Sequence, residues 1–185
     1  MDKSYGTIVT ADPKDLEEIT RSLHELNTQS DRAAAIVGAA ILDIALTHAL
    51  KRYLHDWPKV TKRLFSINGA VGNLGPKIDL ALLIGLVGED AYNDLVIVKE
   101  IRNKFAHGLD VSDFKSDPIA ALSNKLKIAD IRTFDGKEPK NGCWIGVSNR
   151  EAILADPRER FLLNVHVLIY GLSIPGKTAT PSAAF

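Results

Sequence analysis

The chain has 185 residues, 45% of them hydrophobic and 25% charged, which is the balance of a globular protein with one core and excludes a disordered or membrane class. Lys plus Arg and Asp plus Glu each number 23, so the net charge is zero and no overall positive field would draw the chain onto DNA, RNA or anionic lipid. The single cysteine, Cys143, excludes an internal disulfide, which suits the cytoplasm, and the first residues lack the apolar run of a signal peptide.

The first quarter of the chain carries strong helical signals. Residues 1–11 are expected to form a flexible N-terminus, and an Asp-Pro start predicts a first helix over residues 12–27. A second, longer helix is predicted over residues 30–54, with a serine as its cap. Its stretch 33–46 is apolar nearly all round, which predicts a central element buried on several sides, while Asp43 argues against a membrane span.

Proline and glycine divide the next part of the chain. Pro58 ends the long helix, and a short basic helix is predicted over residues 59–65. A glycine-rich loop, 67–75, then precedes two helices, 76–87 and 89–107, which are expected to form a tight antiparallel pair.

The sequence signals for helices weaken after this pair and become strong again at the last helix. An Asp-Pro start at Asp117 predicts a short helix, and apolar segments around a turn-rich stretch could close a small β-hairpin near 128–147. A strongly striped helix begins at Asp156, and residues 175–185 are expected to be a flexible tail. The sequence therefore predicts one all-α domain over residues 12–174, a helical bundle of about six helices.

Three of the predicted helices place a charge on their apolar face. Arg102 falls on the stripe of its helix, Asp43 shares the stripe of the long helix with Arg32, and Asp79 lines up with leucines on a third helix. Because an unpaired buried charge is costly, we expect Arg102 to contact Asp43, Asp79 or both. Together with Arg32 these residues form the predicted structural polar core.

Four segments of the chain form a recognisable combination. They are Ser30-Asp31-Arg32-Ala33-Ala34-Ala35-Ile36-Val37, Leu42-Asp43-Ile44-Ala45-Leu46, Lys77-Ile78-Asp79-Leu80-Ala81 with Gly85-Leu86, and Ile101-Arg102-Asn103-Lys104-Phe105-Ala106-His107. In order and spacing they resemble the mannitol operon repressor family, over about residues 27–108, with a weaker echo at 156–161. The resemblance implies an all-helical transcriptional regulator without a recognisable DNA-reading module. The sequence agrees, since it has no helix-turn-helix, zinc-finger spacing or basic region, and binding another protein is at least as expected as binding DNA.

The last of these segments also resembles the signature of HEPN domains, with Arg102, Asn103 and His107 in the motif positions. That resemblance implies a metal-independent endoribonuclease or an RNA-binding module, in which arginine holds the scissile phosphate and histidine exchanges a proton. The motif persists in noncatalytic members, and His107 could instead cap the last carbonyls of its helix. Two classes stay open: a regulator without chemistry and a ribonuclease, with the zero net charge favouring the first.

No cofactor or metal is expected. The five histidines are scattered, without zinc spacing, and the loop 67–75 lacks the Lys-Ser/Thr of a phosphate loop. Basic clusters at 51–52, 59–63 and 158–160 are of a size that is usually solvated surface. A homo-oligomer is expected, because the helices offer more apolar surface than one small bundle can cover.

Overall fold

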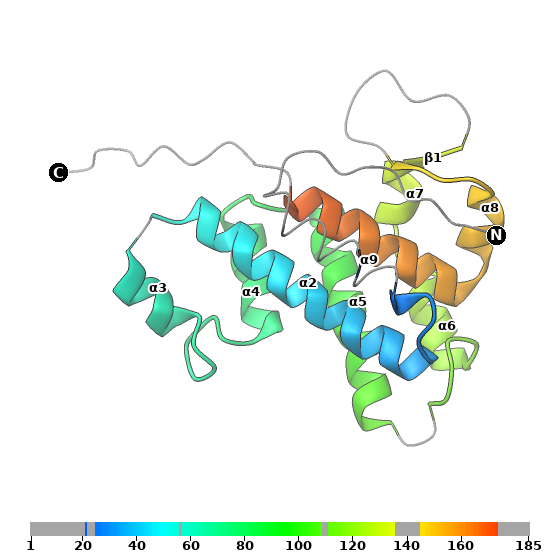
Figure 1. Cartoon of the computed structure of the whole chain (residues 1–185), viewed down its shortest axis with the longest axis horizontal. Coiled ribbons are helices and arrows are strands. Elements are labelled where there is room, and N and C mark those ends of the chain that lie inside the picture. The colour runs from blue at the N-terminus through cyan, green and yellow to red at the C-terminus, as the bar shows by residue number, and fades with distance from the viewer. Residues whose placement is uncertain (1–20, 22–24, 56, 109–110, 136–144, 174–185) are drawn as a thin grey trace.

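The computed structural model describes residues 21, 25–55, 57–108, 111–135 and 145–173, and it confirms an all-α bundle with a small β element (Figure 1). The elements are α2 (Asp31–Tyr53), α3 (Pro58–Leu64), α4 (Leu74–Leu83), α5 (Glu89–His107), α6 (Asp117–Ser123), α7 (Ile128–Arg132), β1 (Thr133–Phe134), β2 (Ile145–Gly146), α8 (Arg150–Ala155) and α9 (Pro157–Ser173). The terminal segments 1–11 and 175–185, nearly all of the predicted helix 12–27, and Cys143 lie outside the described residues.

Helix α2 is the central element of the bundle, as its sequence predicts. It packs against α9, α5 and α4, and its buried face is rich in alanine, which lets these neighbours approach closely. The hydroxyl of Ser30 caps its start by accepting a hydrogen bond from the Ala33 N–H at 3.3 Å. By length and composition α2 could cross a membrane, but half of its most apolar 18-residue window is buried inside the bundle.

The antiparallel pair of α4 and α5 is joined by a turn that depends on Gly85. This glycine has φ +72°, a left-handed conformation that disfavours any side chain. The N–H of Gly85 donates to the carbonyl of Leu82, and the N–H of Leu86 donates to that of Ala81, so the last carbonyls of α4 are satisfied. The helix begins at Leu74, two residues before the predicted proline start.

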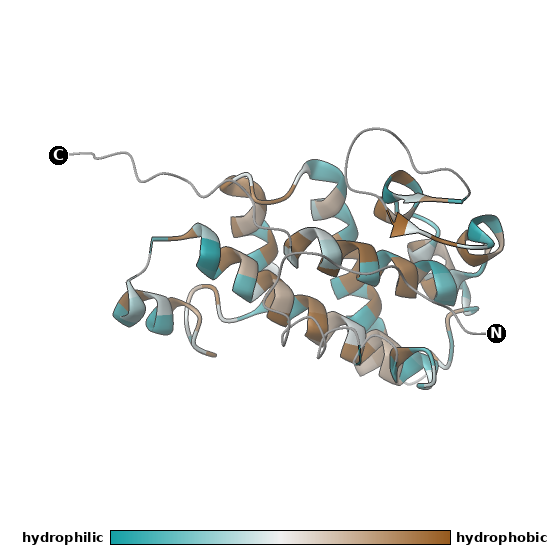
Figure 2. Ribbon diagram, turned by 45° about the horizontal axis from the view of Figure 1, so that its top comes forward, coloured by the Kyte–Doolittle hydropathy of each residue, from teal (hydrophilic) through white to brown (hydrophobic). Residues whose placement is uncertain are grey.

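Helix α9 closes the other side of the core. Residues 161–169 are buried without interruption, because α9 packs on α2, α6, α7 and α8 together. Phe114 packs between α5 and α9: the centroid of its ring lies 5.0 Å from that of Phe105 on α5 and 5.0 Å from that of Phe161 on α9. In Figure 2 hydrophobic and hydrophilic residues alternate along the helices of the bundle.

The small β element lies where the sequence predicts it, but its strands do not form a hairpin. Thr133 pairs with Ile145 and Phe134 with Gly146, and the two strands run parallel. A parallel pair needs the chain to cross back before the second strand, so a tight turn cannot connect the two strands. The connecting residues 136–144 lie outside the described part of the chain.

Candidate functional site

The start of α2 is a polar junction that ties the two ends of the described chain together. The Asp31 carboxylate accepts a hydrogen bond from the Phe114 N–H at 2.8 Å and forms an ion pair with Arg158 at the start of α9. Arg158 also donates to the carbonyl of Gln29 at 2.7 Å. These contacts give the family-like segments near residues 31 and 158 a structural role.

Arg32 holds the end of α5. Its guanidinium donates to the carbonyls of Phe105 at 2.5 Å, Gly108 at 3.1 Å and Val111 at 2.9 Å. The last carbonyls of a helix have no partner inside the helix, so this fork satisfies groups that would otherwise stay half-buried and unbonded. Arg32 therefore caps the end of α5, a role for which the sequence analysis considered His107.

The expected ion pair of Arg102 with Asp43 does not form. The Asp43 carboxylate instead accepts two hydrogen bonds from the Lys77 ammonium, each at 2.8 Å, and the Lys77 side chain is only 6% exposed. The physical reason is that Arg102 and Asp43 lie at different heights along the axis of the bundle. Arg32 reaches the end of α5, where Arg102 lies, and Asp43 is about 16 Å further along α2 at a rise of about 1.5 Å per residue.

The expected contact of Arg102 with Asp79 is also wrong. Asp79 is exposed, and its carboxylate accepts a hydrogen bond from the Tyr92 hydroxyl at 3.3 Å, near the other end of α5. The buried face of α4 consists of Leu74, Lys77, Ile78 and Ala81. The predicted face was therefore displaced by one residue, which rotates a helix by about 100°.

Arg102, Asn103 and His107 lie in the last two turns of α5 without bonding to one another. Arg102 is half-buried, and Asn103 and His107 are exposed. Within the described part of the chain the Arg102 guanidinium makes no hydrogen bond or ion pair. A half-buried guanidinium that no described carboxylate neutralises can bind an anion.

A buried acidic group that the sequence analysis did not single out organises the other end of α5. The fully buried Asp94 carboxylate accepts hydrogen bonds from the N–H groups of Lys127 and Ile128, at 2.9 and 2.7 Å, and so holds the start of α7. Burial raises the pKa of this carboxyl, while the hydrogen bonds from Ile128 and Lys127 lower it in part. Helical spacing from Asp94 to the buried Val98 and Ile101 was the available signal.

The most exposed part of the described chain is an arm around α3, which projects from the bundle at the left of Figure 1. No residue of α3 is buried. The arm combines cations and large apolar side chains, which we call the basic arm: Lys51, Trp57, Lys59, Val60, Lys62, Arg63 and Ile67. Trp57 is 61% exposed and Ile67 82%.

The charge of this region is one-sided. From Lys51 to Ile67 the sequence has three lysines and two arginines but one acidic residue, Asp56. By contrast, the basic cluster at 158–160 is bound internally, since Arg158 pairs with Asp31 and Arg160 with Asp130. The basic arm is thus a locally positive surface of a neutral protein, and it carries an exposed tryptophan.

Among the described residues, no three His, Cys, Asp or Glu side chains gather as a metal site would require. No protein-family model matches the sequence, and no curated protein does. A solved structure is similar: a chain in the X-ray structure of the MtlR–HPr complex from Escherichia coli has a TM-score of 0.63 at 18% identity, over 84% of this chain and 98% of that chain. At this level of identity the likeness shows the fold.

Proposed function

We propose that this protein is a cytoplasmic regulator of the mannitol operon repressor type, which acts by binding another protein through the basic arm. The observation that carries the proposal is α3 itself: a helix without a buried residue, beside an exposed tryptophan and with three cations and no acid. A short helix with no fully buried residue gains little from packing on its own fold. Tryptophan and arginine are the side chains that interfaces favour, and Trp57 and Arg63 are both exposed on the arm.

The partner that fits this arm has an acidic surface with an apolar pocket for Trp57. Positive charge on the arm would steer such a partner toward it, and the indole would supply most of the contact energy. The MtlR chain of the similar structure is in a complex with HPr, which makes HPr the first partner to test. Regulation of transcription would then follow from this protein contact, without a DNA-reading element on the chain.

The test is isothermal titration calorimetry of the purified protein with HPr at low salt. We expect Trp57→Ala to weaken binding by tenfold or more, at about 2 kcal/mol for an interface anchor, and Lys59→Glu with Lys62→Glu to abolish it. Lys125→Glu, an equally exposed lysine outside the arm, is the matched control and should bind normally. Absence of binding to the wild type at millimolar HPr would exclude HPr as the partner. Unchanged binding in both arm variants would exclude the arm.

A ribonuclease is the second candidate, and one observation favours it: the Arg102 guanidinium is not neutralised by any described carboxylate. Incubation of the protein with mixed RNA in EDTA tests it, with His107→Ala as the variant. RNA cleavage that the variant loses would support a metal-independent nuclease using Arg102, Asn103 and His107. RNA that stays intact with both proteins would exclude the ribonuclease, and the regulator would be the remaining candidate.

A further inference from the structure

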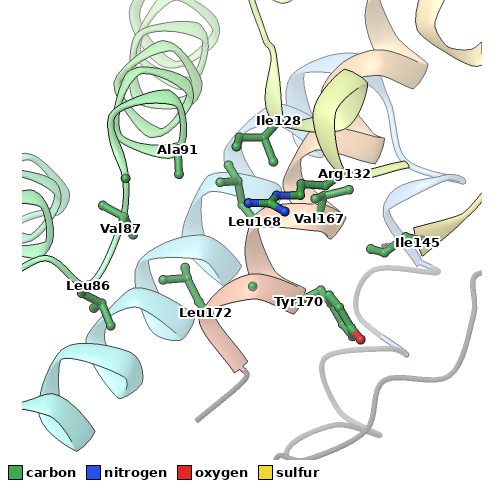
Figure 3. Close-up of a pocket in the computed structure, with 12 residues that line it drawn as sticks. Leu86, Val87, Ala91, Ile128, Arg132, Ile145, Val167, Leu168, Tyr170 and Leu172 are labelled. Atoms are coloured by element: carbon green, nitrogen blue, oxygen red, sulfur yellow. The ribbon is translucent and has the colours of Figure 1, made fainter. Parts of the chain in front are cut away.

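An apolar cavity of about 440 Å³ lies between the start of α5, α7 and the end of α9 (Figure 3). Its walls are mostly aliphatic: Val87 lies in the turn before α5, Ala91 on α5, Ile128 on α7, and Leu168 and Leu172 on α9. The volume is in the range of sites that bind small metabolites. The α7 side of the cavity lies away from α3, which projects at the opposite side of the molecule in Figure 1, whereas its Leu172 end lies beside α2, where the Leu172 carbonyl accepts a hydrogen bond from Arg52 at 2.5 Å.

One cation borders this cavity. Figure 3 shows the Arg132 side chain extending over the aliphatic walls beside Val167 and Leu168. Its guanidinium makes no hydrogen bond or ion pair with any residue that the structure describes, whereas most described arginines donate to a carbonyl or carboxylate, namely Arg32, Arg52, Arg150, Arg158 and Arg160.

The acid nearest to Arg132 in the described sequence is already engaged. The Asp130 carboxylate pairs with Arg160 at 2.5 Å, and its carbonyl accepts from Arg150 at 2.6 Å. The next acid, Asp135, lines a different cavity, beside Asn149 and Glu151. Among the described residues Arg132 therefore has no anionic partner, and this exposed cation at the edge of an apolar site gives the site a preferred ligand charge.

We propose that this cavity binds a small amphiphilic carboxylate, with its hydrocarbon body between α5, α7 and α9 and its carboxylate on the Arg132 guanidinium. Arginine donates two parallel hydrogen bonds to a carboxylate, which fixes the head group at this end of the cavity. The exposed acids Glu89 and Asp90 at the start of α5 favour the same orientation, because they repel an anion at the opposite end.

The walls also decide against other ligand classes. A sugar or nucleoside would bury hydroxyl groups against aliphatic side chains that offer no hydrogen bonds, which is costly. A cation would face Arg132 and gain nothing from it. A neutral alcohol of the same length fits the walls but leaves the guanidinium unused, so it should bind more weakly than the carboxylate.

Calorimetric titration of the full chain with sodium octanoate, below its micelle concentration, tests the proposal. We expect affinity to rise about fifteenfold from hexanoate to octanoate and again to decanoate, since each step adds two methylenes and each buried methylene contributes about fourfold. Arg132→Ala should weaken octanoate by about tenfold and leave 1-octanol unchanged. Gly171→Leu places a side chain in open space on the cavity wall and should weaken both ligands.

Lys125→Ala removes one exposed positive charge elsewhere and should bind octanoate like the wild type. Octanoate affinity that survives both Arg132→Ala and Gly171→Leu would overturn the proposal, as would no binding of decanoate at millimolar concentration. Equal loss of octanol and octanoate in Arg132→Ala would assign Arg132 to the wall and overturn its role in charge recognition. None of these outcomes depends on the basic arm, whose variants should bind octanoate normally.

Discussion

At the scale of single residues, arginine does most of the long-range polar work in this protein. Arg32 fastens the end of α5 through three carbonyls, and Arg158 fastens the start of α9 to α2. Both reach across more than seventy positions of sequence. A planar guanidinium suits this role because one side chain can donate to several acceptors in fixed directions, which an ammonium cannot.

Replacing Arg32 tests this role. Arg32→Ala leaves three half-buried carbonyls without a donor, so we expect the free energy of unfolding to fall by about 2–3 kcal/mol. Arg32→Lys should recover less than half of that loss. Urea denaturation measures the loss of free energy of unfolding. Arg63→Ala is the control, because Arg63 is exposed and its guanidinium bonds to no described residue. A loss below about 0.5 kcal/mol for Arg32→Ala would contradict the capping role.

His166 gives the fold a pH dependence. Burial lowers its pKa from the ordinary value near 6.5, and its Nδ1 lies 2.8 Å from the Leu162 carbonyl. As pH falls below about 6.5, the unfolded chain takes up a proton at this histidine before the folded protein does. Stability is therefore present above that pH and is lost as pH falls toward the folded pKa, by at most about 1.4 kcal/mol per pH unit.

The measurement is thermal melting from pH 7.5 to 5.5 in the wild type, His166→Leu and the exposed control His48→Gln. The variant at 166 should lose part of the acid sensitivity, and the control should keep it. Comparing variants cancels the opposite effect of Asp94, whose raised pKa makes the folded state bind a proton first at lower pH. Identical pH slopes in all three proteins would show that His166 does not titrate in this range.

At the scale of elements, the ion pair of Asp43 and Lys77 joins α2 to α4. Asp43→Ala would leave the Lys77 ammonium nearly buried without a carboxylate, and we expect a loss of about 2–3 kcal/mol. Adding Lys77→Met should restore more than half of it, because the stranded charge is removed. Denaturation of the four proteins of this cycle measures the coupling. Arg102→Lys is the contrast and should change stability by less than about 0.5 kcal/mol.

The same pair shows how far the sequence could predict the packing. Periodicity identified the long central helix, the α4 and α5 pair and the striped last helix, because each depends on local apolar spacing and on caps. It placed Asp43 on a buried face, but it carried no information about the level at which neighbouring helices meet. Asp43 therefore pairs with Lys77, which lies at the same height along the bundle. Arg102 lies at the other end of the contact between α2 and α5.

The candidate surfaces follow the same rule. The sequence shows basic clusters at 59–63 and 158–160 alike, and only tertiary structure separates the one that projects into solvent from the one bound by Asp31 and Asp130. The cavity beside Arg132 joins residues that are up to 86 positions apart, Leu86 to Leu172, so no local pattern could predict it. The buried Asp94 was missed as well, although its helical spacing to Val98 and Ile101 was a local signal that could have found it.

At the scale of the whole molecule, α2 leaves part of its apolar surface uncovered. Ile36, Val37 and Ile44 are 37%, 42% and 55% exposed, on one stripe that also carries the small Ala40. A second copy of the chain fits this stripe, because antiparallel pairing about Ala40 would lay each apolar stripe on the other. The exposed Lys51 would then lie about 16 Å from that centre in each copy, so the two lysines would stay far apart.

We therefore expect a dimer at micromolar concentration, measured by light scattering on a size-exclusion column. Ile44→Glu would place a charge within the paired stripes, one turn from Ala40 and opposite Ile36 of the other copy, and should give a folded monomer that melts like the wild type at dilutions where it is monomeric. Leu83→Glu is the control, because Leu83 is 83% exposed on α4, away from the stripe, and should stay dimeric. A wild-type monomer at about 50 µM would exclude this pairing. A dimer that persists in Ile44→Glu would place the contact on another surface. A glutamate that is buried without a partner in an apolar interface causes a large loss of affinity.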